Sequence, residues 1–215
     1  WDHVWHWRLL RGPMIDRLLR RHVACAAATL TVTDALAEAY ARDYGFRPTV
    51  LLNAPERVPL PAARPCDPHA VRIVHHGVAG RARRLDGMVR AVALARDRFA
   101  LDLYLVAGDP GYASELAELG GRLAPGRVRV LPPVASRDIV PTLAAYDVGL
   151  FVLPPTTFNY RHALPNKLFD FIAAGLAVVI GPSPEMARIV GAHDCGVVAP
   201  SFEPGDVAGV LRALD

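Results

Sequence analysis

The chain has 215 residues, of which 52% are hydrophobic and 21% charged, and its net charge is +3. This content suffices for the core of one large domain, or of one domain and part of another, and the small charge disfavours a nucleic-acid-binding protein. The three cysteines are scattered and match neither a disulfide framework nor a metal-ligand spacing, so a reducing compartment, the cytoplasm, is expected. No apolar run approaches the ~18 residues of a membrane-spanning helix.

Residues 1–22 are rich in tryptophan and arginine and begin without methionine. Such a segment can rest on an anionic membrane surface, which would place the protein at the inner face of the membrane. Alternatively, it packs against a domain that precedes the sequence given. We favour the second interpretation and expect a fragment of a longer protein. The residues concerned are Trp1, Trp5, Trp7, Arg8, Arg11, Arg17, Arg20 and Arg21.

The next part of the chain is expected to hold two helices and two strands, followed by a linker. Asp34 is expected to cap the second helix and Gly45 to end it. The proline-rich stretch 54–70 has no periodicity, which is typical of a linker. We therefore assign residues 1–53 to the end of an N-terminal domain. The expected elements are a basic amphipathic helix at 13–28, a strand at 29–33, a helix at 34–44 and a strand at 49–52.

From residue 71 to residue 215, apolar runs alternate with helical patterns. This rhythm predicts an α/β domain with a doubly wound parallel sheet, Rossmann-like, whose ligands bind where the carboxyl ends of the strands meet. The expected strands lie at 71–75, 101–107, 128–131, 148–153, 177–180 and 196–199. The expected helices lie at about 86–98, 112–123, 136–145, 165–174, 184–190 and 204–214.

The stretch 159–182 reads as a polar loop, a short helix and a buried strand. Pro165 suits the first helical turn, and Gly175 suits the position just past the helix end. Apolar residues can then face a core while Lys167 and Asp170, three residues apart, share the opposite side. A charged pair at the start of a helix that follows a polar loop indicates a ligand site.

Lys167 is the only lysine among 24 lysines and arginines. It is either required as a compact charge with rotatable donors or retained by chance on a solvated face, and composition leaves both open. The loop 75–84 combines glycines with Arg81, Arg83 and Arg84 before a helix, which suits a diphosphate. The sequence contains no G-x-G-x-x-G fingerprint and no Walker A motif.

Several of these segments together resemble the donor-binding, C-terminal half of GT-B glycosyltransferases, specifically the retaining enzymes of glycosyltransferase family 4. The most specific is Leu164-Pro-Asn-Lys-Leu-Phe-Asp-Phe-Ile-Ala-Ala-Gly175, and the others are residues 50–53, 76–86, 105–109 and 146–150. The resemblance implies transfer of a sugar from a nucleoside-diphosphate sugar with retention of configuration. It implies no cofactor and no metal, because side chains and helix N-termini can stabilise the leaving diphosphate.

The resemblance also implies roles for individual residues. Arg83 and Lys167 would stabilise the diphosphate, with Arg81 as a helper, and Asp170 would hold the ribose. Asp170 and His162 stand where the family has two glutamates, so both depart from its pattern. Glycines would let the backbone approach the donor, and backbone amides at the helix start would reach the anion; these residues are Gly77, Gly80, Leu164, Pro165 and Asn166. Glu185 either faces the cleft or compensates a helix dipole.

Residues 1–53 are too few for the acceptor-binding domain of such an enzyme. We therefore expect this chain to bind the donor and to be inactive without its N-terminal, acceptor-binding domain. Two alternatives stay open. The first is an enzyme similar to nucleotide-sugar 2-epimerases, and the second is a non-catalytic module whose donor site has decayed.

Overall fold

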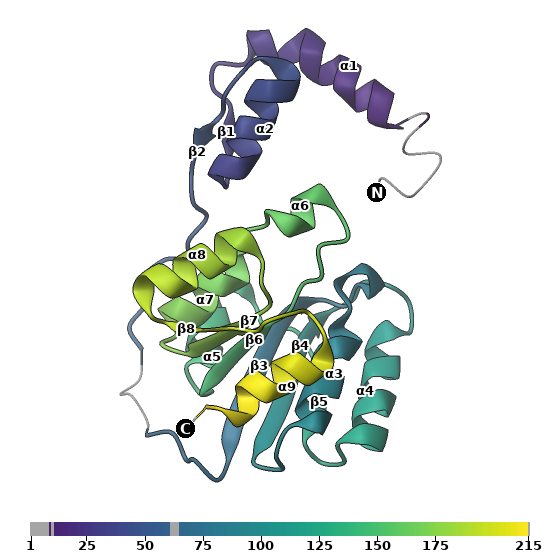
Figure 1. Cartoon of the computed structure of the whole chain (residues 1–215), viewed down its shortest axis with the longest axis vertical. Helices are drawn as coiled ribbons and strands as arrows, with labels where there is room; N and C mark the ends of the chain where they lie inside the picture. Colours follow the sequence, from purple (N-terminus) through teal and green to yellow (C-terminus); the bar gives the residue numbers. More distant parts are fainter. Residues whose placement is uncertain (1–8, 10, 61–64, 215) are drawn as a thin grey trace. The chain divides into compact units, whose positions relative to one another are not determined.

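The computed structural model describes residues 9, 11–60 and 65–214, and its backbone divides into two compact units (Figure 1). The first unit joins residues up to Asn53 to the segment Pro155–Leu164, and the second contains Ala54–Pro154 and Pro165–Asp215. Within the described ranges, no helix is both long and apolar enough to cross a lipid bilayer. The residues on which the membrane interpretation mainly rests, Trp1, Trp5, Trp7 and Arg8, lie outside those ranges.

The first unit contains a parallel pair of very short strands and three α-helices in its described part. Thr33, rather than Asp34, caps α2: its hydroxyl oxygen accepts a hydrogen bond from the Leu36 N–H at 3.3 Å. Gly45 ends α2 with φ 75°, as expected. The helix expected at 13–28 is shorter and ends at His22. The elements are α1 (Gly12–His22), η2 (Val23–Cys25), β1 (Leu30–Thr31), α2 (Asp34–Tyr44), β2 (Thr49–Val50) and α6 (Phe158–Arg161).

The second unit is built on a six-stranded parallel sheet in the order β5-β4-β3-β6-β7-β8. Within this sheet, the chain begins at β3 in the middle and proceeds outward through β4 to β5. It then returns to β6, beside β3, and proceeds outward through β7 to β8. This is the doubly wound, Rossmann-like arrangement that the alternation of strands and helices predicted. The strands are β3 (Val71–Val78), β4 (Phe99–Val106), β5 (Val128–Leu131), β6 (Val148–Phe151), β7 (Ala177–Ile180) and β8 (Gly196–Val198).

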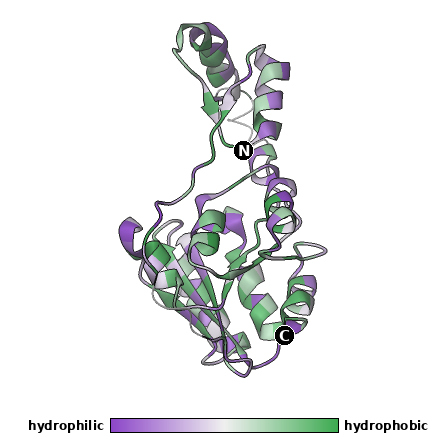
Figure 2. Cartoon of the chain, turned by 90° about the vertical axis from the view of Figure 1, so that its left-hand side faces the viewer, coloured by the Kyte–Doolittle hydropathy of each residue, from purple (hydrophilic) through white to green (hydrophobic). Residues whose placement is uncertain are grey.

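Helices pack in two groups in this unit: α3 lies between α4 and α9, and α5 packs against α7 (Figure 1). Apolar side chains of the first group and of the central strands form a continuous core. Hydrophobic residues run through the strands, and hydrophilic ones lie mainly on the outer helices (Figure 2). The helical elements are η3 (Arg81–Arg83), α3 (Leu85–Leu94), α4 (Tyr112–Leu123), η4 (Ser136–Asp138), α5 (Ile139–Leu143), α7 (Asn166–Ala173), α8 (Pro184–His193) and α9 (Pro204–Arg212).

A close approach of helix α7 to the sheet depends on a glycine. A Cβ atom on Gly149 of β6 would lie 2.3 Å from the ring of Phe171, which is fully buried. Only a residue without a side chain allows the ring to lie against the strand at this distance. Gly175, with φ 76°, follows the helix as expected and returns the chain directly to β7. This packing places the first turn of α7 beside the carboxyl ends of the central strands.

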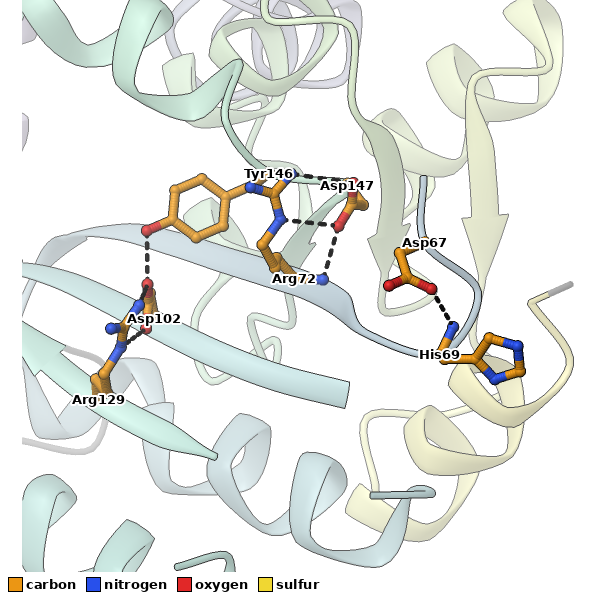
Figure 3. A network of polar contacts seen from close by, with 7 residues as sticks. All are labelled: Asp67, His69, Arg72, Asp102, Arg129, Tyr146 and Asp147. Atoms are coloured by element: carbon orange, nitrogen blue, oxygen red, sulfur yellow. Dashed lines mark hydrogen bonds and ion pairs between the residues drawn. The ribbon is translucent and has the colours of Figure 1, made fainter. Parts of the chain in front are cut away.

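A polar network fastens the other end of the central strands (Figure 3). The Asp147 carboxylate, just before β6, accepts hydrogen bonds from the backbone N–H and the guanidinium of Arg72 at the start of β3. The buried carboxylate of Asp102 accepts from Arg129 and, at 2.6 Å, from the Tyr146 hydroxyl. Burial, followed by the hydrogen bond to Asp102, raises the pKa of Tyr146. The predicted segment 146–150 thus begins with residues that have a structural role.

Candidate functional site

The strands β3 and β6 separate at their carboxyl ends. Their pairing covers only Ile73 with Val148 and Val74 with Gly149, although β3 continues to Val78. The chain changes its winding direction between these two strands, and such a point in an open α/β sheet leaves a crevice where ligands bind. The strand β3 is three residues longer than expected, so the glycine loop is residues 79–84, which follow it. This loop and the start of α7 both lie at this end of the sheet.

The backbone of the glycine loop is fixed by the turn that follows β4. The Asp109 carboxylate accepts a hydrogen bond from the Arg81 N–H at 2.6 Å, and the Asp109 N–H donates to the Ala79 carbonyl at 2.8 Å. A Cβ on Gly108 would lie 2.4 Å from that same carbonyl oxygen, so the two turns are in tight contact. The loop is therefore held in one conformation as it leads into η3 and α3.

Lys167 extends from the first turn of α7 across Gly77. Gly77 has φ 137°, and a Cβ there would lie 2.9 Å from the Lys167 Nζ. The ammonium lies 4.9 Å from the centre of the Phe151 ring, and Lys167 is only 8% exposed. Burial, then the charge of Arg83, lowers its pKa from 10.5 to about 8, although Asp170 opposes the shift. Lys167 is thus a buried cation, and the alternative that placed it on a solvated face is wrong.

A second cation, Arg83, lies close enough to depress the pKa of Lys167. Arg83 is half-buried, and its stem packs against Gly80, whose Cβ would lie 3.8 Å from the Arg83 Cδ. The Arg83 guanidinium has no hydrogen bond or ion pair with any other residue that the structure describes. Two neighbouring cations without a compensating ion pair attract an anion that carries more than one negative charge.

Asp170 and two histidines of β3 lie near these cations. Asp170 is 8% exposed, and its Oδ2 lies 3.3 Å from the Nε2 of His76, the residue before Gly77 in β3. Burial, followed by the charge of Lys167, holds the pKa of His75 well below its usual value, so His75 is neutral at pH 7. Its Nδ1 lies 3.0 Å from the Leu150 carbonyl oxygen. His76 was not among the predicted site residues, and its place in the segment 75–84, which was predicted as a loop, is the only signal that could have found it.

The N-terminus of α7 points its positive dipole end toward the loop that precedes it. Pro165 is the N-cap, with extended backbone at φ −77° and ψ 149°, and the helix starts at Asn166. We expected Pro165 inside the first helical turn, whereas it lies at the residue just before that turn. No side chain caps this end. Leu164, which precedes Pro165, is buried and belongs to the first unit.

Three of the residues proposed from the sequence have other partners. Arg81 is exposed and makes two hydrogen bonds to Glu115 of α4, at 2.7 and 2.5 Å. His162 lies in the first unit, just after α6, with its ring 4.6 Å from that of Phe158. Glu185, in the first turn of α8, is buried and lies 3.7 Å from the Arg188 guanidinium. In the part of the chain that the structure describes, no cluster of three or more His, Cys, Asp or Glu residues could hold a metal ion.

Together, these residues place two cations and a carboxylate where the pairing of β3 and β6 ends. Lys167 and Arg83 offer ammonium and guanidinium donors to phosphate oxygens. The side chains of these two cations occupy the space beside Gly77 and Gly80, which the sequence had predicted to be open to the donor. Asp170 offers carboxylate oxygens, which accept hydrogen bonds from hydroxyl groups. The arrangement is suited to a ligand that has adjacent phosphate and hydroxyl groups.

Comparison with solved structures shows the same fold in glycosyltransferases. The chain is similar to HepE from Anabaena, solved with UDP (17% identity, TM-score 0.71, 98% of this chain and 58% of that one). It is also similar to WaaG, a glycosyltransferase of lipopolysaccharide biosynthesis (17%, 0.62, 85% and 52%). A third is the pneumococcal O-GlcNAc transferase GtfA, solved with UDP and GlcNAc (13%, 0.65, 92% and 40%). The chain thus spans little more than half of these proteins, or less.

A search of curated protein sequences found no significant match. Residues 70–214, by contrast, match the family described as glycosyl transferases group 1. This segment includes the whole six-stranded sheet and the crevice with Lys167, Arg83 and Asp170. The chain therefore belongs to the group 1 glycosyl transferases.

Proposed function

We propose that the second unit binds a nucleoside-diphosphate sugar in the crevice between β3 and β6, as the donor-binding domain of a retaining glycosyltransferase of the family 4 type. The observation that carries the proposal is the pair of neighbouring cations, Lys167 and Arg83, at the point where the sheet changes winding direction. Two of the structural neighbours, HepE and GtfA, were solved with UDP, which supports a nucleoside diphosphate as the ligand.

In this proposal the diphosphate lies against Lys167 and Arg83, and the ribose hydroxyls donate hydrogen bonds to Asp170. During transfer, the bond between the anomeric carbon and the β-phosphate oxygen breaks, and its electron pair stays on the diphosphate. The new bond forms to the acceptor hydroxyl oxygen, whose proton passes to an oxygen of the leaving diphosphate, and the configuration of the sugar is retained. The two cations stabilise the negative charge that develops on the leaving diphosphate. Neither a cofactor nor a metal ion takes part.

The acceptor and part of the sugar environment would come from an N-terminal domain, of which residues 1–53 are the last portion, while residues 54–70 connect it to the donor domain. The chain by itself then binds donor without transferring sugar. A nucleotide-sugar 2-epimerase is not favoured, because the matched family and two of the structural neighbours, WaaG and GtfA, are glycosyltransferases. A decayed site is not favoured either, because Lys167 remains buried as a charged group at a cost that an idle site would not need.

Calorimetric titration of the 215-residue chain with UDP, GDP and ADP tests the proposal, together with an assay for hydrolysis of the corresponding sugar donors. We expect saturable binding of at least one nucleotide and no turnover. Absence of binding by all three would refute the donor site. Efficient donor turnover would leave the site intact but refute the requirement for a further domain.

A further inference from the structure

We propose that His76 is a positioning residue, which acts by holding the carboxylate of Asp170 toward the ribose and away from Lys167. This inference rests on the proposed function of the site. It assigns a role to His76, which has none in the proposed binding of the donor. It also accounts for how a site with an aspartate, one methylene shorter than glutamate, can present its carboxylate in a defined direction.

The first observation is the contact itself. His76 Nε2 lies 3.3 Å from Asp170 Oδ2, and each side chain is 12% exposed. Nε2 is inaccessible to solvent, and it has no aligned hydrogen-bond partner among the described residues. The imidazole ring meets the ring of Phe171 edge-on, with the centroids 5.6 Å apart. The ring is therefore fixed by packing, and the Asp170 carboxylate is the polar group within its reach.

The second observation concerns the pair that does not form. Lys167 and Asp170 are three residues apart on α7, a spacing that brings oppositely charged side chains together. Their charges do interact, since Asp170 raises the pKa of Lys167. Even so, no ion pair within 4.0 Å joins them in the described structure, while the carboxylate lies beside His76. Contact with His76 thus prevents the anion from neutralising the cation that a diphosphate needs.

These observations lead to one arrangement of the bound state. The Nε2–H of His76 donates to Oδ2 of Asp170, and the remaining lone pairs of the carboxylate accept from the ribose hydroxyls. The 3.3 Å contact is long and poorly aligned without ligand. We expect it to become a regular hydrogen bond when the ribose orients the carboxylate, because unliganded sites often hold such contacts in a looser geometry. His76 then acts on the ligand only through Asp170.

The test compares UDP with 2′,3′-dideoxy-UDP, which lacks the ribose hydroxyls, as calorimetric ligands of the full chain. His76→Phe keeps an aromatic ring against Phe171 but removes the donor, whereas His76→Gln keeps an N–H at a similar reach. His69→Phe, at an exposed histidine of the same unit, is the matched control. Melting temperatures of all variants separate a loss of positioning from a loss of fold.

We expect His76→Phe to lower UDP affinity about five-fold, the effect of one hydrogen bond, with dideoxy-UDP affinity unchanged. His76→Gln should retain most of the discrimination between the two ligands, and His69→Phe all of it. If His76→Phe does not fold, His76→Ala serves for the same comparison. If His76→Phe loses affinity equally for both ligands, or discriminates between them as the wild type does, His76 does not have this role, although the donor site stays in place. Failure of the wild-type chain to bind UDP would overturn the site and this role together.

Discussion

Replacing Lys167 by methionine is expected to stabilise the unliganded protein while it removes nucleotide binding. The lysine side chain lies in a space bounded by Gly77 and the Phe151 ring and is almost inaccessible to water. Methionine has a similar length and no charge, so it can fill this space without the cost of burying an ammonium. Such opposite effects on stability and binding are typical of a buried charge kept for function.

The magnitude follows from the lowered pKa. Lys167 has a pKa of about 8 instead of 10.5, and each unit of pKa corresponds to about 1.36 kcal/mol. At pH 7 the amine is protonated in both folded and unfolded chains, so the folded state bears a cost of about 3 kcal/mol. We therefore expect Lys167→Met to raise the free energy of unfolding by up to about 3 kcal/mol at pH 7.

The pH dependence of stability independently tests whether the charge of Lys167 destabilises the folded protein. Between pH 8 and 10.5 the folded chain releases the Lys167 proton while the unfolded chain still holds it. Stability of the wild type should therefore rise with pH in this window relative to Lys167→Met, until the difference disappears near pH 10.5. Urea unfolding at pH 7, 8.5 and 10 measures both proteins. Arg137→Met, at a side chain that is 88% exposed, is the control and should change stability by less than about 0.5 kcal/mol.

Two outcomes would refute this reasoning. If Lys167→Met is less stable than the wild type at pH 7, the ammonium is stabilised by its surroundings and is no buried cost. If the stability difference between the two proteins does not change with pH, the pKa of Lys167 is not lowered. Either result would remove the electrostatic basis for an anion site beside Gly77.

Three further substitutions test the surroundings of the site. Gly77→Ala should cost about 1–3 kcal/mol of stability, because φ is 137° and the methyl group would lie 2.9 Å from Lys167 Nζ; urea unfolding no different from wild type would contradict this. Tyr146→Phe should cost about 1–2 kcal/mol by removing the 2.6 Å hydrogen bond to Asp102, again measured by urea unfolding, and should leave UDP affinity unchanged. Asp170→Ala should cost about 1.5–3 kcal/mol of UDP affinity by calorimetry and abolish discrimination against 2′,3′-dideoxy-UDP; persistent discrimination would show that Asp170 does not bind the ribose.

The sequence predicted the doubly wound sheet well, because strand and helix periodicities are local properties. The expected strands at 128–131 and 177–180 match β5 and β7 residue by residue. The boundaries that differ depend on neighbours: β4 begins two residues earlier than expected, where Phe99 pairs with Val71. Local periodicity does not predict the order of the strands in the sheet, since that order depends on contacts between residues far apart in the chain.

The site was predicted less completely, for reasons that concern packing. The pattern of α7 alone places Lys167 away from the core, but its side chain occupies the space beside Gly77, near the end of the pairing between β3 and β6. Arg81 and Arg83 look equivalent in the sequence. Glu115, 34 residues away, engages Arg81 and leaves Arg83 near Lys167. Such distinctions require the tertiary structure.

Calorimetric comparison of UDP and uridine tests most directly whether Lys167 and Arg83 bind a diphosphate. Uridine has the same base and ribose but no phosphate. The difference in affinity between the two ligands therefore measures the contribution of the diphosphate to binding. In the wild-type chain UDP should bind much more tightly than uridine, whereas in the double variant Arg83→Gln, Lys167→Met the two ligands should bind with nearly equal affinity. A double variant that still binds UDP as tightly as the wild type does would show that the diphosphate lies elsewhere.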